Sequence, residues 1–395
     1  SNAPVVSSTT LHRTFSDCDK VVNIGTGWDV SSVENFSNMF SGALDFNGSD
    51  LVNWNTSSAT NMYQMFYYAM DFNQDISGWN TSDVTTMSQL FRNASSFNKD
   101  LNSWNTSSVT TINSMFRDAP AFNGNISSWN LTACTNISEL FTNAAAFNQN
   151  VGAWRFHSSC TYFYRVFKNA TSFNNGGSDS IKDWDTSNGV RMDYCFQGAS
   201  SFNQPLTNWN TANVTKMLYT FADADVFNQN IGSWDTSNVD RMDNMFIRAK
   251  AFNNGGSDSI KNWDTSSVTR MDYMFTDAEA FNQPIVTNGV KWDVSNVTLM
   301  NGMFYDAEDF EQDLSTWDFG EVTTFGDFLR GVTFTTANYN RLLHQINASN
   351  TKTDIVFNGG SSTVDAGGGG VPNGETARQA LLDRSPSWSI ADGDS

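Results

Sequence analysis

Tryptophan recurs at a nearly constant interval, and this interval constrains the fold more than any other feature of the sequence. Twelve of the 13 tryptophans keep one register, with steps of 25 or 26 residues and three longer steps of 29 or 30. They are Trp28, Trp54, Trp79, Trp104, Trp129, Trp154, Trp184, Trp209, Trp234, Trp263, Trp292 and Trp317. A fixed period of roughly 20 to 50 residues marks solenoids and propellers. We therefore expect one repeat domain instead of two or three globular ones.

The repeating unit reads W-[ND]-T-S-x-V-T-x-M-x-x-M-F-x-x-A-x-x-F-N-Q-x-I-x-x. Its apolar residues follow neither a helical stripe nor a strand alternation. A chain that coils around an axis gives such spacing, and stacked turns bury the core that one turn cannot close. For the rung of Trp79 we predict a short parallel strand around 76–79, a second extended stretch at 84–87 and one helical turn at 88–94. About twelve such rungs would form the solenoid.

Composition and polar positions agree with stacked rungs. The chain has 31 Phe and 13 Trp, and aromatic side chains in such numbers must be buried. An Asn or Asp follows most of the tryptophans, which predicts a tight turn closed by its side chain. A second Asn follows the repeat's Phe, where it could bond the backbone of two rungs and form a ladder.

The repeat divides the chain into three parts. Residues 1–27 are expected to hold a tag remnant and an N-terminal cap, in which Phe15, Val21, Val22 and Ile24 cover the first Trp. Residues 28–329 form the solenoid. Residues 330–395 form a small α+β C-terminal cap, with helices at 337–346 and 375–382 and strands at 354–357 and 387–390. We expect a soluble fragment whose native leader has been removed.

Two segments carry a family resemblance, FNQDISGWNTSDVTTMSQLF (72–91) and FNQNIGSWDTSNVDRMDNMF (227–246). They resemble the unit of BspA-type leucine-rich-repeat surface proteins, a group also described from mycoplasma lipoproteins. The resemblance extends roughly from Trp28 to Trp317. It implies a leucine-rich-repeat-like β-solenoid, a cell-surface or secreted location and a role in adhesion or ligand binding, with no catalytic residues.

The net charge of −19 argues against two classes of partner. Phosphate backbones and anionic lipid surfaces would be repelled, so we expect neither nucleic-acid nor membrane-surface binding. No run approaches the roughly 18 apolar residues of a membrane span, so we expect no membrane insertion by this chain. We expect a monomer.

Catalysis is not predicted. His12, His157 and His344 lie far apart in the sequence and none adjoins a motif Ser or Cys. The acidic residues recur at turn positions, so no carboxylate pair stands out. The sequence therefore predicts a protein that is not an enzyme and has no cofactor.

Three rungs carry a four-residue insertion before the Trp, at 175–183, 254–262 and 284–291. Insertions at one register position emerge on one edge of a solenoid, where binding loops grow. Their basic residues, Lys182, Lys261 and Lys291, could recognise an anionic glycan or an acidic peptide. The loops around Asp179 and Asp258 could form a weak Ca²⁺ site, although one carboxylate per loop falls short of six to eight oxygens and favours a plain polar loop.

Two further columns of residues are candidates for binding. Arg191, Arg241 and Arg270 precede the repeat's Met, and each is followed two residues later by an Asp that could simply compensate its charge. Tyr194, Tyr219 and Tyr273 share another position, where aromatic side chains could stack on sugar rings or pack half-buried on the solenoid.

Two cysteines occupy one repeat position in successive rungs. Stacking would bring the Cα atoms of Cys134 and Cys160 into the range of roughly 4.4 to 6.8 Å that permits a disulfide. Two buried thiols that pack as small apolar side chains are the alternative.

Two functions remain after these exclusions. The first is a non-catalytic surface-exposed or secreted binding or adhesion module that recognises a host or neighbouring-cell glycan, protein or extracellular matrix. It would use one solenoid face and the inserted loops. The alternative is a stalk or spacer of a larger surface protein, with no ligand of its own.

Overall fold

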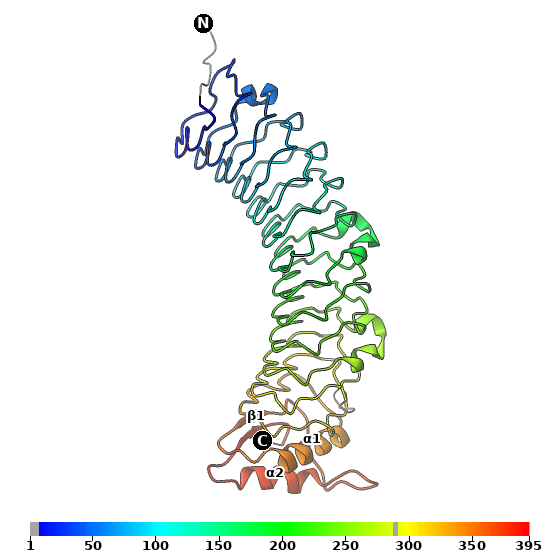
Figure 1. Ribbon diagram of the computed structural model, residues 1–395. Coiled ribbons are helices and arrows are strands. Elements are labelled where there is room, and N and C mark those ends of the chain that lie inside the picture. The colour runs from blue at the N-terminus through cyan, green and yellow to red at the C-terminus, as the bar shows by residue number, and fades with distance from the viewer. Residues whose placement is uncertain (1–7, 287–290, 395) are drawn as a thin grey trace. The chain divides into compact units, whose positions relative to one another are not determined.

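The chain folds into stacked rungs, each about one repeat long. The structure, a computed structural model, describes residues 8–286 and 291–394. Packing divides the chain into two units, one of Ser1–Gly189 with Tyr194–Gln204 and one of Val190–Asp193 with Pro205–Ser395. Within each unit the successive turns of the chain lie one on the next (Figure 1). The protein is thus a repeat solenoid, as its period predicts.

Backbone hydrogen bonds tie each rung to the next. In the rung of Trp79, the amides of Met87, Gln89, Phe91 and Asn93 donate to carbonyls of the following rung at 2.9–3.1 Å. Donation by alternate residues is the pattern of a parallel ladder. Yet among the described residues the rungs are joined by isolated bridges, nearly all of them parallel, such as the bridge from residue 86 to residue 111, and not by continuous strands.

The predicted strand and helical turn within the rung are wrong. Ser77 and Gly78 form a turn, and residues 88–93 form consecutive turns instead of a helix. The reason lies in two residues with left-handed backbone, Gln89 with φ 57° and Asn93 with φ 63°. Such residues interrupt both helix and strand. Equivalent residues recur through the repeats, and we call them the first and second left-handed positions.

Aromatic rings fill the core in columns. The ring of Phe91 lies 5.6 Å from that of Phe66 and 5.7 Å from that of Phe116, and both pairs are nearly parallel. Trp79 and Trp104 stack in a second column at 6.4 Å. The indole N–H of Trp104 donates to a core carbonyl of the previous rung at 3.1 Å, so the one polar atom of the ring is satisfied.

The predicted polar columns are confirmed. The Asn98 amide donates to Oδ1 of Asn73 in the rung before it at 3.0 Å, which is the expected asparagine ladder. The Ser82 amide donates to Oδ1 of Asn80 at 3.0 Å and closes the turn after the Trp. Thr81, buried next to it, donates its hydroxyl to a carbonyl of the following rung at 3.0 Å. These bonds join neighbouring rungs as well as closing each turn.

The N-terminal segment stacks on the first full rung. Phe15 lies parallel to Phe40 at 5.5 Å and edge-on to Trp28 at 5.7 Å. Ile24 contributes its carbonyl, which accepts the indole N–H of Trp28 at 3.1 Å. Val22 is 55% exposed, so its predicted place over the first Trp is wrong. The side chain points to solvent because Phe15 already covers that end of the aromatic column.

The C-terminal segment forms the predicted α+β arrangement. It contains α1 (Thr336–Ser349), β1 (Val356–Asn358), α2 (Gly374–Leu382) and β2 (Ser389–Ala391), with β1 and β2 parallel (Figure 1). The apolar face of α1 is buried as its spacing predicts. A bridge from residue 325 to residue 357 joins this segment to the last rungs.

The other helices are short 3₁₀ segments beside the tryptophans. They are η1 (Ser49–Asn53), η2 (Asn175–Gly177), η3 (Asp179–Asp183), η4 (Asn254–Gly256) and η5 (Asp258–Asn262). Among residues 8–286 and 291–394, no helix has the length and apolar character needed to cross a bilayer.

Candidate functional site

The first two insertions are held in place by hydrogen bonds, both within the insertion and to the rung before it. In the first, Asn175 is fully buried and donates to the Ser178 carbonyl at 2.7 Å, while its Oδ1 accepts the Val151 amide at 2.8 Å. Ser180 donates to Oδ1 of Asn150 in the preceding rung at 2.9 Å. The insertion expected to be a plain polar loop thus consists of two 3₁₀ turns, η2 and η3, which are fastened to the rung before them.

The second insertion repeats this network in the other unit. Asn254 donates to the Ser257 carbonyl at 2.6 Å, and Ser259 donates to Oδ1 of Asn230 at 2.8 Å. The third insertion, 284–291, includes residues 287–290, which lie outside the described part of the chain, so only its flanks can be compared.

The insertion lysines do not form one free basic cluster. Lys182 and Lys261 are each paired with a carboxylate of their own insertion, Asp179 and Asp258 respectively. These pairs reduce the charge that the lysines offer to a ligand, and they engage the carboxylates proposed for Ca²⁺. Within the described ranges, no group of three or more His, Cys, Asp and Glu side chains is placed to hold a metal.

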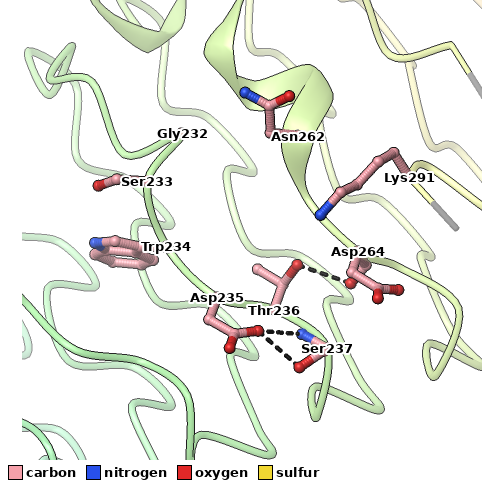
Figure 2. Close-up of a pocket in the computed structure, with 9 residues that line it drawn as sticks. All are labelled: Gly232, Ser233, Trp234, Asp235, Thr236, Ser237, Asn262, Asp264 and Lys291. Carbon is pink, nitrogen blue, oxygen red and sulfur yellow. Dashed lines mark hydrogen bonds between the residues drawn. The ribbon is translucent and has the colours of Figure 1, made fainter. Parts of the chain in front are cut away.

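Lys291 lines a polar pocket of about 450 Å³ in the second unit. Figure 2 shows its side chain directed toward the pocket, opposite the turn that carries Asp235. Asp235 accepts the amide and hydroxyl of Ser237 at 3.0 and 2.7 Å. These bonds, together with the charge of Lys291, lower the pKa of the Asp235 carboxyl. The pocket therefore combines one cation, Lys291, with two carboxylates, Asp235 and Asp264, that are already engaged in turns.

The arginine column is engaged within the protein. Arg191 pairs with Asp193 at 2.7 Å and Arg241 with Asp243 at 2.6 Å. Arg270 makes the same pair with its own Asp at 3.3 Å. The aspartates are at most 7% exposed, so each arginine neutralises a buried carboxylate of its own rung. Charge compensation within the rung therefore explains these arginines better than ligand binding does.

The three tyrosines lie at the first left-handed position, with φ between 53° and 58°. Tyr194 belongs to the first unit, and Tyr219 and Tyr273 belong to the second. Tyr273 is 40% exposed and lies against Gly302 of the next rung, where any Cβ would meet its ring. Tyr194 and Tyr219 are half-buried. None of the three is buried in the core, so each leaves part of its side chain at the surface.

A basic and aromatic surface in the first unit was missed by sequence analysis. Its centre is Arg165, whose guanidinium lies 4.6 Å from the ring of Tyr164 and 4.8 Å from that of Tyr194. Lys168 lies over the same Tyr194 ring at 5.1 Å. We call this surface the arginine–tyrosine corner. It comprises Arg92, Arg117, Tyr164, Arg165, Lys168 and Tyr194.

A sequence signal for this corner exists. Arg92, Arg117 and Lys168 occupy one repeat position, which directly follows the Phe of the repeat's Met-Phe pair. The segments are LFRNA, MFRDA and VFKNA. Arg165 does not share that position. Its contact with Tyr194, 29 residues away, follows only from the stacking of rungs.

Cys134 and Cys160 are buried free thiols in the structure, so the disulfide alternative is not present. Burial raises the pKa of Cys134 to about 11 and that of Cys160 to about 12. The Cys134 thiol points to the Asn136 carbonyl at 3.6 Å. Both side chains therefore pack as small apolar residues.

One histidine lies beside a serine that its sequence position did not indicate. His12 Nδ1 lies 2.7 Å from the Ser37 hydroxyl in the following rung. Ser37 is only 4% exposed, which leaves no room for a substrate carbonyl at its oxygen. The contact is therefore a link between rungs rather than a nucleophile with its base.

Comparisons with known proteins give one family. A family model described as "Mycoplasma protein of unknown function, DUF285" matches residues 9–109, 74–180, 177–258 and 256–341. No curated protein matches the sequence. Among solved structures, an internalin (inlF) from Listeria monocytogenes aligns with 86% of this chain and 75% of its own, at 7% identity and a TM-score of 0.24. A TM-score this low does not establish a common fold.

Proposed function

The chain belongs to the DUF285 family, described from Mycoplasma as proteins of unknown function, and from this premise we propose that it is a non-catalytic binding or adhesion module. It acts at the cell surface or as a secreted protein and recognises a host or neighbouring-cell glycan, protein or matrix. About twelve leucine-rich-repeat-like rungs, akin to those of BspA-type surface proteins, form its platform. It works as a monomer without a cofactor.

The observation that carries this proposal is the side-chain chemistry at the first left-handed position. Left-handed backbone is least costly for Gly and Asn, and costs other residues roughly 1–2 kcal/mol. Some rungs do use Asn244 or Gly302 there. Others use tyrosine, arginine, glutamine or glutamate, which gain nothing from that conformation. Their side chains lie outside the filled core, so their chemistry serves the surface.

The backbone beneath these side chains is already ordered. The Tyr273 amide donates to the next rung at 2.8 Å, and the Tyr219 amide does so at 3.3 Å. A ligand that meets side chains on an ordered backbone loses less conformational entropy on binding. This preorganisation suits recognition, and it gives no support to catalysis.

Arrays of glycans and of extracellular matrix proteins test the proposal with purified chain. We expect at least one ligand to bind the parent, and binding to fall about tenfold or more in Tyr219→Ala/Tyr273→Ala or in the triple alanine variant of the insertion lysines. Val226→Ala is the matched control, because this exposed apolar residue lies on another part of the rung.

Two results would contradict parts of the proposal. Parental binding by both variants would mean that the ligand uses neither of these surfaces. Failure of the parent to bind anything on either array would favour the spacer function, in which the rungs only separate other domains.

A further inference from the structure

The arginine–tyrosine corner reverses the charge of the molecule locally. The chain carries a net charge of −19. In the five rungs that form this corner, the segments 88–93, 113–118, 138–143, 164–169 and 193–198 hold four basic and three acidic residues. A positive surface on such an acidic protein requires an explanation, because general solubility would favour the opposite sign.

The three carboxylates of these segments are already engaged. Asp193 pairs with Arg191 at 2.7 Å. Glu139 pairs with Arg117, lies 3.5 Å from Arg165 and accepts the Ser114 hydroxyl at 3.2 Å. Asp118 accepts Arg117 Nε at 3.2 Å. Glu139 and Asp118 therefore neutralise Arg117 and part of the Arg165 charge.

Two cations of the corner remain without a carboxylate. Arg92 and Lys168 make no ion pair among the residues that the structure describes. Arg92 only donates to the Gln89 side chain at 3.2 Å and lies over the Tyr67 ring at 5.6 Å. The pKa of Lys168 is lowered by burial and by the positive charges of Arg165 and Arg117, consistent with an excess of positive charge.

The same corner leaves buried polar atoms without partners. Four buried side-chain atoms make no hydrogen bond within the described part of the protein. They are Nε of Arg92, Nε of Arg165, Oδ1 of Asn93 and Oε1 of Gln197. A buried polar atom without a partner is costly, and a group of them marks incomplete solvation of a site. All four belong to the left-handed segments of the first unit, in the rungs that build the corner.

The aromatic rings add a second type of contact. Tyr164 and Tyr194 stand edge to face at 6.1 Å and 88°, with the Arg165 guanidinium over both rings. This packing holds the arginine in place before any ligand arrives. A planar guanidinium suits carboxylate or sulfate oxygens, and the surface part of a half-buried tyrosine suits contact with the apolar face of a sugar.

From this geometry we propose that the arginine–tyrosine corner binds an acidic polysaccharide, whose sugars carry sulfate or carboxylate groups. The anionic groups contact Arg92, Arg165 and Lys168, and a sugar ring packs beside Tyr194. Arg92 and Lys168 hold one repeat position three rungs apart, which is about 14 Å at the 4.8 Å spacing of stacked strands. A ligand that reaches both cations must therefore carry anionic groups along its length, as an acidic polysaccharide does. The inference rests on the proposed binding function and adds the class of ligand and its location.

Titration of the whole chain with heparin, hyaluronan, polyglutamate and uncharged dextran at 50 and 300 mM NaCl tests this proposal. We expect binding to heparin or hyaluronan that weakens at the higher salt, and none to dextran. Heparin carries sulfates and carboxylates whereas hyaluronan carries carboxylates alone, so their comparison identifies the anionic group.

Variants locate the site. We expect Arg92→Gln/Lys168→Gln to weaken binding about tenfold or more, and Tyr194→Ala to weaken it further than Tyr194→Phe. Arg330→Gln is the matched control, because Arg330 holds the same repeat position in the second unit and lies over Tyr305 at 5.3 Å, but is paired with Asp327. Circular dichroism and melting temperature verify that each variant is folded.

Three outcomes would overturn the proposal. They are no binding to either acidic polysaccharide at 50 mM NaCl, equal losses in the corner variants and Arg330→Gln, or tighter binding of polyglutamate at the corner. The broader binding function would still hold in each case if the arrays identify a glycan or protein ligand and the corner variants bind that ligand with the affinity of the parent.

Discussion

Each turn after a tryptophan is closed by one short polar side chain, and its identity sets the response to acid. In most rungs that residue is Asn or Asp. Asp235 accepts both the Ser237 hydroxyl and the Ser237 amide, and these bonds lower the pKa of its carboxyl. The folded state therefore binds fewer protons than the unfolded state near pH 4. This stabilisation is present above the ordinary Asp pKa and is lost as the pH falls through the folded-state value.

Asp235→Asn should keep the turn but lose this acid dependence. Asn80 closes the same turn with the same 3.0 Å bond to a serine amide. We expect urea unfolding midpoints of the variant to fall less than those of the parent between pH 7 and pH 3. The reciprocal variant Asn80→Asp should fall more. Equal acid sensitivity in all three proteins would contradict the assignment.

The cysteines differ in reactivity because they differ in burial. Cys134 and Cys160 are buried with raised pKa values, and the pKa of buried Cys195 is raised even further. Cys18 is half-buried. The thiolate is the reactive form, so buried protonated thiols react slowly.

Alkylation followed by mass spectrometry tests this difference. We expect iodoacetamide at pH 8 to modify Cys18 in the native chain and all four cysteines in urea without reductant. Two unmodified cysteines in urea would instead reveal the disulfide between Cys134 and Cys160. Rapid native labelling of Cys195 would contradict its burial.

At the scale of elements, each described insertion depends on the rung before it. Gly152 and Gly232 both lie two residues before the Trp of that rung. A Cβ at either position would overlap Ser180 or Ser259 of the following 3₁₀ turn, including backbone atoms. Glycine therefore occurs where the insertion contacts the preceding rung, and the two pack together closely.

Gly152→Ala and Gly232→Ala should each destabilise the protein by about 1–3 kcal/mol, as overpacking does. Gly78→Ala is the matched control, since it holds an adjacent position in a rung without insertion and a Cβ there meets nothing within 4 Å. We expect that control to lie within about 0.5 kcal/mol of the parent in urea unfolding. Equal effects of all three substitutions would contradict the packing argument.

At the scale of the whole molecule, a stack of rungs must end, and here the C-terminal cap closes it. Asp392 is fully buried and accepts two bonds from Arg378 at 2.9 Å and the Tyr339 hydroxyl at 2.8 Å. Burial and the Asp392 charge raise the pKa of the Tyr339 hydroxyl, which remains a donor. This one carboxylate thus links α1, α2 and the end of β2.

Asp392→Asn should remove the main counter-charge of Arg378 inside the cap. Breaking a buried pair in this way costs about 3–5 kcal/mol. We expect a lower melting temperature and early proteolysis after residue 330. Asp383→Asn, which changes an exposed carboxylate at the end of α2, is the control and should melt like the parent. Equal melting of both variants would contradict a stabilising role for this carboxylate.

The sequence by itself determined the features that each rung repeats. The period, the aromatic columns, the turns closed by Asn80 and its equivalents, and both helices of the cap follow from local patterns. Each rung packs on a near copy of itself, so one rung's pattern describes its neighbours. The same logic explains why the asparagine ladder could be predicted.

Only the tertiary structure decided what happens between unlike rungs. The left-handed residues that replace the predicted strand have no single residue preference, because tyrosine, glutamine and arginine all occupy them. The ion pair of Arg117 with Glu139, the packing of the first insertion on Gly152, and the place of Arg165 between two tyrosines depend on which side chains meet across rungs. Such contacts join residues some 22 to 30 positions apart. Their partners are set by stacking, which a local pattern does not encode.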